Sequence, residues 1–231
     1  MAKTKLDWRF IDAVNGANLN LEQVPYQPSK VKRLLGFEMT PKEIGCYLSH
    51  MACWRACVDI GKPTLIFEDD FVIQPHLEEV LETLCLDFKF WDIIRLQALI
   101  DSSDLLVKKF KDFSLVQNLD DPLGATAYMV NPRSALQLLS TSTDIFEPLD
   151  HFIEHVEKHG LKIFAIKPYP VTVLDPTRAT STITDRPARL PIRGRKKLLR
   201  SFHRLLDRLF SSSPFFPIKP PSACRTKSFS V

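Results

Sequence analysis

Three consecutive carboxylates, Glu68, Asp69 and Asp70, follow the apolar segment Thr64–Phe67. An unpaired carboxylate is costly to bury, so this charge must either face water or hold a cation. Mg²⁺ and Mn²⁺ are commonly held by one or two carboxylates together with phosphate oxygens. The segment therefore predicts either a polar loop at a strand end or a hard-cation site, and three adjacent carboxylates favour the cation site.

The elements around this cluster carry clear helix and strand signals. Thr40 and Glu43 form a Thr-x-x-Glu capping box with Pro41 at the first helical position, and Gly61 marks the far end. These signals predict a helix over 41–60, a short buried strand at "TLIF" and a second helix over 74–84. In open α/β sheets the ligand crevice lies beyond the carboxyl ends of the strands, which is where the carboxylates fall.

Other segments complete an α/β pattern. Strands are predicted at 91–97, 113–119, 126–130 and 162–166. A helix beginning after Asn131 and another over 148–159, stopped by Gly160, lie between them. Strands that alternate with helices predict one α/β domain whose helices pack on the faces of a sheet.

Composition excludes several classes of protein. No apolar run approaches the roughly 18 residues of a membrane span, and the start of the chain lacks a secretory pattern. Five cysteines, three of them on one predicted helix, do not form a disulfide framework, so a cytoplasmic location is expected. Positive charge is concentrated in residues 193–210 and the body is mildly acidic, which gives nucleic-acid binding no support.

Five ordered blocks of sequence resemble a known family. They are "FIDAVNG" (10–16), "MTPKEIGCYLSHMACWRACVDIGKPTLIFEDDFVI" (39–73), "LGATAYMVNPRSALQLL" (123–139), "PLDHFI" (148–153) and "TSTI" (180–183). In order and spacing they resemble the family 25 glycosyltransferases of lipopolysaccharide biosynthesis. The most specific part is Gly-Cys-x-x-Ser-His followed by an apolar strand and Glu-Asp-Asp.

The resemblance implies a GT-A-like, Rossmann-type nucleotide-sugar transferase domain over residues 1–183. Such an enzyme would transfer a hexose, in the first place galactose, from a UDP-sugar to a lipopolysaccharide or lipooligosaccharide acceptor with inversion. On this chain Asp69 and Asp70 would hold Mn²⁺ or Mg²⁺ at the donor diphosphate, with Glu68 beside them. Asp150, in the "PLD" block, is the expected general base.

Four further residues are candidates for the donor site through the same blocks. Ser49 and His50 could reach the donor, although His50 is equally well read as a core histidine. Gly124 precedes a predicted strand and would allow the backbone to approach the sugar closely. Asp12, near Asn15, belongs either to a substrate-binding loop or to a simple Asx turn.

The resemblance also suggests a role for the C-terminal region. Residues 184–210 are predicted to be a basic linker and amphipathic helix, with Arg200, Arg204 and Arg208 opposite an apolar face, and 211–231 a disordered tail. The helix could dock on the body, bind a partner or lie on anionic lipid. A lipid-linked glycan acceptor favours the last, with the enzyme peripheral on the inner membrane.

Two zinc patterns and one inactive state are the alternatives. Cys46, His50, Cys53 and Cys57 share a helical face but extend over about 16 Å, too far for one tetrahedral zinc. The "HFIEH" pattern at 151–155 matches the H-x-x-E-H signature of a zinc peptidase, without an evident third ligand. The family is also expected to place a strand well before "DAVNG", so a truncated homologue without turnover remains an alternative.

Overall fold

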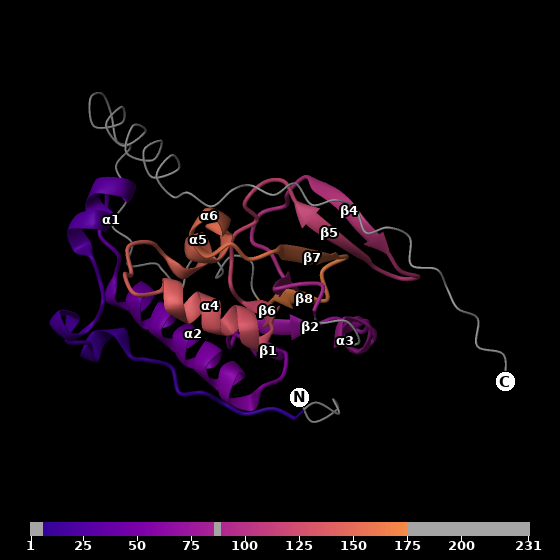
Figure 1. The fold of residues 1–231 in the computed structure, drawn as a ribbon, viewed down its shortest axis with the longest axis horizontal. Helices are drawn as coiled ribbons and strands as arrows, with labels where there is room; N and C mark the ends of the chain where they lie inside the picture. The colour runs from indigo at the N-terminus through magenta and orange to yellow at the C-terminus, as the bar shows by residue number, and fades with distance from the viewer. Residues whose placement is uncertain (1–6, 86–88, 175–231) are drawn as a thin grey trace.

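The computed structural model describes residues 7–85 and 89–174 and contains one six-stranded sheet flanked by helices (Figure 1). The strand order is β1-β6-β3-β7-β5-β4. The bounds are β1 (Thr64–Phe67), β6 (Ala127–Val130), β3 (Ile93–Arg95), β7 (Ile163–Lys167), β5 (Ser114–Asn118) and β4 (Asp104–Lys109). A second, two-stranded sheet pairs β2 (Phe71–Ile73) with β8 (Val171–Val173).

The directions of the strands place several chain segments at one edge of the sheet. β3 and β7 pair in parallel, whereas β6 runs antiparallel to both of its neighbours, β1 and β3. β1, β3 and β7 therefore point the same way, and their carboxyl ends meet the amino end of β6. The predicted α/β class is confirmed, with a sheet of mixed direction, and the acidic cluster lies at this shared edge.

Helix α2 (Pro41–Ile60) has the predicted bounds because the predicted capping interactions form at both of its ends. Glu43 N donates to Thr40 Oγ1, Thr40 N donates to the Glu43 carboxylate, and Gly61 adopts the left-handed conformation. The other helices are α1 (Pro28–Leu35), α3 (Leu77–Cys85), α4 (Pro132–Thr141), α5 (Leu149–Glu154) and α6 (Val156–His159). Two short 3₁₀ turns, η1 (Gly16–Asn18) and η2 (Leu21–Gln23), precede α1.

The prediction of a single helix over 148–159 is wrong in one respect. The segment divides at His155, whose backbone (φ −80°, ψ 63°) is not helical, into α5 and α6. The predicted stop at Gly160 is confirmed, since this residue is left-handed and its N–H bonds to the Val156 carbonyl.

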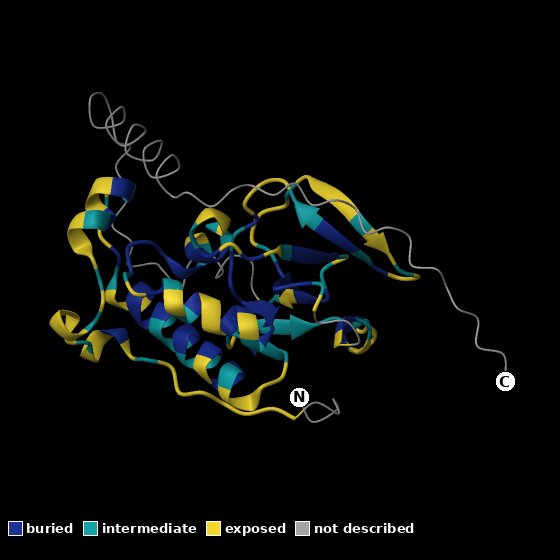
Figure 2. Cartoon of the chain, viewed as in Figure 1, coloured by how far each residue is buried: buried dark blue, intermediate teal, exposed yellow. Residues whose placement is uncertain are grey.

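The central strands of the sheet are buried on both faces, whereas the edge strand β4 is largely exposed (Figure 2). On one face α1, α2, α4 and α5 pack against side chains such as Ile93 and Tyr128. On the other, α3 and the small sheet cover the alternate side chains of the same strands, including Ile94 and Met129. This double cover fixes the central strands β6 and β3, whose ends carry the site.

The segment before α2 packs directly on that helix. A Cβ atom at Gly16 would overlap the Pro41 carbonyl oxygen, and one at Gly45 would come within 2.5 Å of the Val14 carbonyl oxygen. Ser49 Oγ accepts a hydrogen bond from Val14 N (2.9 Å) and donates to the Gly45 carbonyl (2.8 Å). The contact between loop and helix therefore depends on two glycines and one serine.

Replacement of Gly16 by alanine should test this contact. The added methyl group must push the loop off α2, and overpacking of this kind costs about 1–3 kcal/mol. Urea denaturation should show this loss for Gly16→Ala and almost none for Asn18→Ala, which changes an exposed residue of the same 3₁₀ turn. Equal midpoints for the two variants would contradict the tight packing of the loop.

Three of the sequence predictions fall outside the described residues. The basic linker and helix of 184–210, with the tail of 211–231, lie there, as does the "TSTI" block. Among the helices that the structure describes, none combines the length and apolar character that a bilayer span requires.

Candidate functional site

Glu68, the first residue after β1, is surrounded by hydrogen-bond donors from α2 and from Thr126, the residue before β6. Thr126 Oγ1 donates to Oε2 (3.1 Å), while Cys46 Sγ lies 3.6 Å and His50 Nε2 3.4 Å from Oε1. Burial alone would raise the pKa of Glu68, but the hydrogen bond and charge of His50, with the bonds from Thr126 and Cys46, lower it below the usual value. Glu68 is therefore held as an oriented, ionised carboxylate.

A buried chain of polar groups fixes His50 in turn. The Tyr128 hydroxyl lies 2.8 Å from both Trp54 Nε1 and His50 Nδ1. An indole N–H can only donate, so the hydroxyl accepts from Trp54 and is free to donate its own proton to Nδ1. Nε2, the other ring nitrogen, faces Glu68 and is the atom of His50 that can donate to it. His50 thus acts as a positioning residue for Glu68 from within the core.

This arrangement also gives a physical account of Cys46. Its thiol pKa is raised, first by burial and then by the charge of Glu68, so it remains a protonated donor. Cys46, His50 and Glu68 place one ligand atom each within 4.8 Å of one another, the one group of three His, Cys, Asp or Glu residues in the described part of the chain that does so. The thiol of Cys46 and the ring of His50 are both directed at Glu68. This arrangement favours a hydrogen-bonded cluster that orients Glu68 over a metal site.

The next two carboxylates differ in their surroundings. Asp69 is exposed, whereas Asp70 is half-buried and its Oδ1 atom has no hydrogen-bond partner within the described ranges. The pKa of Asp70 is raised by burial first and then by the charges of Glu68 and Asp69. Asp70 therefore carries an uncompensated negative charge beside two others, which a cation at this point would relieve.

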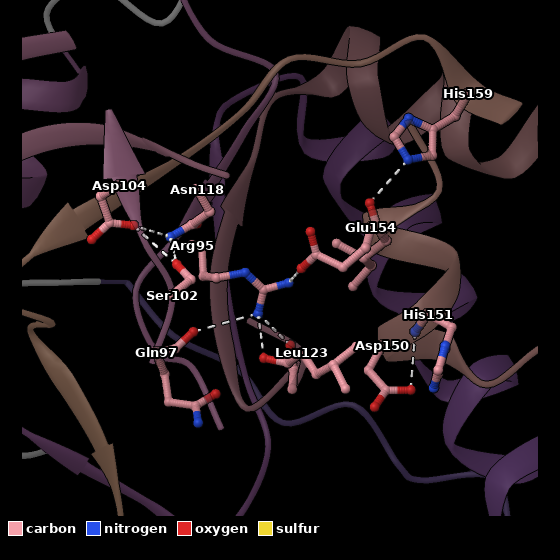
Figure 3. A network of polar contacts seen from close by, with 12 residues as sticks. Arg95, Gln97, Ser102, Asp104, Asn118, Leu123, Asp150, His151, Glu154 and His159 are labelled. Atoms are coloured by element: carbon pink, nitrogen blue, oxygen red, sulfur yellow. Dashed lines mark hydrogen bonds and ion pairs between the residues drawn. The ribbon is translucent and has the colours of Figure 1, made fainter. Parts of the chain in front are cut away.

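Arg95, at the end of β3, links the edge of the sheet to α5 (Figure 3). Its side chain is buried and forms an ion pair with Glu154, while Nη1 donates to the carbonyls of Leu123 (2.9 Å) and Gly124 (2.5 Å). Leu123 (φ 53°) and Gly124 (φ 82°) are both left-handed, a strained conformation for leucine. Arg95 thus clamps an unusual loop immediately before β6.

Sequence reasoning missed this clamp. The available signal was a charged residue inside the apolar run "WDIIRLQ", since a buried arginine requires partners. Gly124 was predicted for its closeness to a ligand, and the structure gives a concrete reason for a glycine there. A Cβ atom would lie 2.9 Å from Leu99 Cγ and 3.0 Å from Gln97 Oε1, besides the cost of the left-handed backbone.

Asp150 lies in the first turn of α5, half-buried, with His151 N donating to its Oδ1 (3.0 Å). Its charge contributes to the raised pKa values of Cys46 and Glu154, behind the larger effect of burial in each case. Asp150 is thus within electrostatic reach of Cys46 in the Glu68 cluster and of Glu154 in the Arg95 clamp.

Two predicted donor residues have no contact with the Glu68 cluster or the Arg95 clamp among the hydrogen bonds of the described residues. Ser49 is engaged by the backbone of Val14 and Gly45, as described above, and Asp12 is exposed in the segment before η1. Asn15 accepts from Ala17 N (3.0 Å), which is the Asx turn given as the alternative for this loop. The contacts of the structure therefore connect His50 with Glu68, whereas Ser49 is bonded to the loop before α2 and Asp12 is exposed.

The H-x-x-E-H pattern does not form a metal centre. His155 Nδ1 lies 2.9 Å from Glu147 Oε1, Glu154 is paired with Arg95, and His151 is exposed. Because these side chains are directed at different partners, the zinc peptidase alternative is not supported by the fold.

Comparison with known proteins supports the family resemblance. Residues 1–153 match the model described as "Glycosyltransferase family 25 (LPS biosynthesis protein)". Procollagen galactosyltransferase 1 of Danio rerio is 26% identical over 189 residues, covering 69% of this chain and 30% of that protein. Lipooligosaccharide biosynthesis protein lic2B of Haemophilus influenzae is 28% identical over 117 residues, covering 47% of this chain and 44% of that protein.

Not every relative is named as an active enzyme. The human protein named "Inactive glycosyltransferase 25 family member 3" is 32% identical over 102 residues, which cover 40% of this chain and 17% of that protein. The chain thus spans less than half the length of each of these three relatives. The family match, in contrast, extends over most of the chain and includes the cluster around Glu68 and the loop at Gly124. By this match, the chain belongs to glycosyltransferase family 25.

Proposed function

We propose that the chain transfers a hexose, in the first place galactose, from a UDP-sugar to a hydroxyl group of a glycan acceptor, with inversion and with Mn²⁺ or Mg²⁺. The observation that carries this proposal is the unpartnered Asp70 Oδ1 atom beside Glu68 and Asp69 at the carboxyl end of β1. Oxygen-only ligands of this kind suit a hard cation that is shared with phosphate groups.

Asp69 and Asp70 offer the oxygen ligands that such a cation prefers. Asp69 and Asp70 would hold the ion, and Glu68 would present a fixed charge beside them because Thr126, Cys46 and His50 donate to it. When bound, the cation would neutralise the negative charge that develops on the departing UDP. The raised pKa of Asp70 supports this role, since burial and its two acidic neighbours disfavour the charge without a counter-ion.

Asp150 is the proposed general base. Inversion requires a group that removes the proton of the acceptor hydroxyl as it attacks, and a carboxylate at the site can do so. Asp150 is half-buried, and its carboxylate bonds only to a neighbouring main-chain N–H among the described residues. It therefore retains lone pairs to receive that proton.

The acceptor and the location are also proposals. Relatives are named for lipooligosaccharide biosynthesis and for galactosyl transfer to procollagen, so an acceptor built of sugar or hydroxyl-bearing residues is consistent with both. We favour a lipid-linked glycan at the cytoplasmic face of a membrane. This preference depends on the basic pattern of residues 196–210 in the sequence.

Titration calorimetry of the full chain with UDP and UDP-galactose tests the proposal. We expect binding of both nucleotides in the presence of Mn²⁺ and a large loss of affinity when the metal is chelated, because the cation supplies the contact with the diphosphate. Binding that is unaffected by chelation would refute the metal assignment. Absence of nucleotide binding under both conditions would instead group the chain with the relatives that are named inactive.

A further inference from the structure

Gln97, two residues beyond β3, has a buried side chain without hydrogen bonds. The residue is 2% exposed, and neither Oε1 nor Nε2 has a partner in the described part of the chain. Its main-chain carbonyl accepts from Arg95 Nη1 (3.4 Å), but no dashed line reaches its amide in Figure 3. Buried polar groups are nearly always paired, so an unpaired carboxamide requires an explanation.

The surroundings hold this amide in a defined place. Gln97 Oε1 lies 3.0 Å from the position that a Cβ atom of Gly124 would occupy, so a side chain at position 124 would crowd the amide. The Leu123–Gly124 backbone is in turn held by Arg95. The amide is therefore packed against a loop whose backbone is held in place by Arg95.

Gln97 and the carboxylates share one edge of the sheet. Glu68 N donates to the Thr126 carbonyl, and Leu96 N donates to the Ala127 carbonyl, so β6 lies between Glu68 and Gln97. Two strand spacings place them about 10 Å apart. This separation suits a ligand whose charged part is at Glu68–Asp70 and whose neutral, hydrogen-bonding part is at Gln97.

We propose that Gln97 binds the hexose of the sugar nucleotide, its Oε1 accepting from one hydroxyl group and its Nε2 donating to a neighbouring one. A carboxamide is both donor and acceptor, which matches a pair of adjacent hydroxyls, and it has no charge with which to balance a diphosphate. This inference rests on the proposed function, because it assigns the sugar part of the same donor. Gln97 would thereby contribute to the choice of sugar.

The first test compares two nucleotides on the full chain in the presence of Mn²⁺. Gln97→Ala should weaken UDP-galactose binding about tenfold or more while UDP affinity stays within about twofold, because the sugar alone loses a hydrogen-bonding partner. Gln117→Ala, a half-buried glutamine on β5, is the matched control and should change neither affinity. Equal losses for both nucleotides would place Gln97 at the nucleotide instead, and no loss for either would remove it from the site.

The second test needs no nucleotide. An unpaired buried amide destabilises the free protein, so Gln97→Met, an apolar replacement of similar length, should raise the midpoint of thermal unfolding by about 2–6 °C. A lowered midpoint would mean that the amide is paired, and would overturn the proposal. If wild-type protein binds neither nucleotide, the proposed function and the sugar assignment fail together, whereas a raised midpoint would still identify an unpaired amide.

Discussion

Replacement of Arg95 by methionine should destabilise the protein by about 3–5 kcal/mol, the usual cost of removing one partner of a buried ion pair. The change would leave Glu154 without its cation and the carbonyls of Leu123 and Gly124 without their donor. The pKa of Glu154 is already raised, by burial first, against the lowering effect of Arg95, so loss of Arg95 should raise this pKa further. Urea denaturation followed by circular dichroism would measure the free energy of unfolding.

Two further variants make this result specific. Lys32→Met removes the surface pair with Glu38, whose side chains are 70% and 63% exposed, and should cost less than about 1 kcal/mol. The double variant Arg95→Met with Glu154→Leu should recover part of the loss, because no buried charge then remains unpaired. A loss for Arg95→Met no larger than that for Lys32→Met would show that Arg95 does not hold the loop.

Asp70→Asn should abolish Mn²⁺-dependent binding of UDP. The amide keeps the size of the side chain but removes the charge, and we expect a loss of affinity of about 100-fold or more, since even residues behind the ligands cost 10–100-fold. Calorimetry with Mn²⁺ would measure the loss. Asp101→Asn, at an exposed position outside the cluster, is the control and should bind UDP as the wild type does. Unchanged affinity for Asp70→Asn would move the metal to other residues.

Asp70→Asn, which should weaken UDP binding, should at the same time stabilise the metal-free folded protein. Folding raises the pKa of Asp70, so the charged carboxylate disfavours the folded state above that pKa and ceases to do so as the pH falls through it. Metal-free Asp70→Asn should therefore be more stable than the wild type at pH 7, and the difference should vanish towards pH 4. Thermal unfolding across this range would show the trend, and a less stable variant at pH 7 would contradict it.

The sequence alone predicts those helices and strands whose ends are marked by local signals. The capping box of Thr40 and Glu43 and the left-handed Gly61 fix α2 at both ends, and its bounds were predicted without error. The strand Thr64–Phe67 was predicted for the same reason, since the end of the helix and the acidic cluster delimit it. The placement of Glu68–Asp70 beyond a strand end followed directly.

Contacts between distant segments were not predictable in this way. The resemblance predicts His50 as a possible donor-site residue, but the contacts of Cys46 and His50 with Glu68, the residue after β1, join separate elements and have no local signal in the sequence. The break at His155 was missed because apolar spacing continues across it. His155 instead pairs with Glu147, eight residues earlier, and leaves the helical conformation. Arg95 and Gln97 were overlooked because a strand sequence does not reveal whether a polar side chain within it has partners.

The Arg95 clamp has a consequence for the order of folding. Its partners lie 28, 29 and 59 residues further along the chain, whereas the cap of α2 joins residues three positions apart. Closing the longer loops costs chain entropy before any contact repays it, so we expect the helix to form early and the clamp late. The edge that carries the carboxylates would then be assembled last, and loss of the clamp would speed unfolding more than it slows folding.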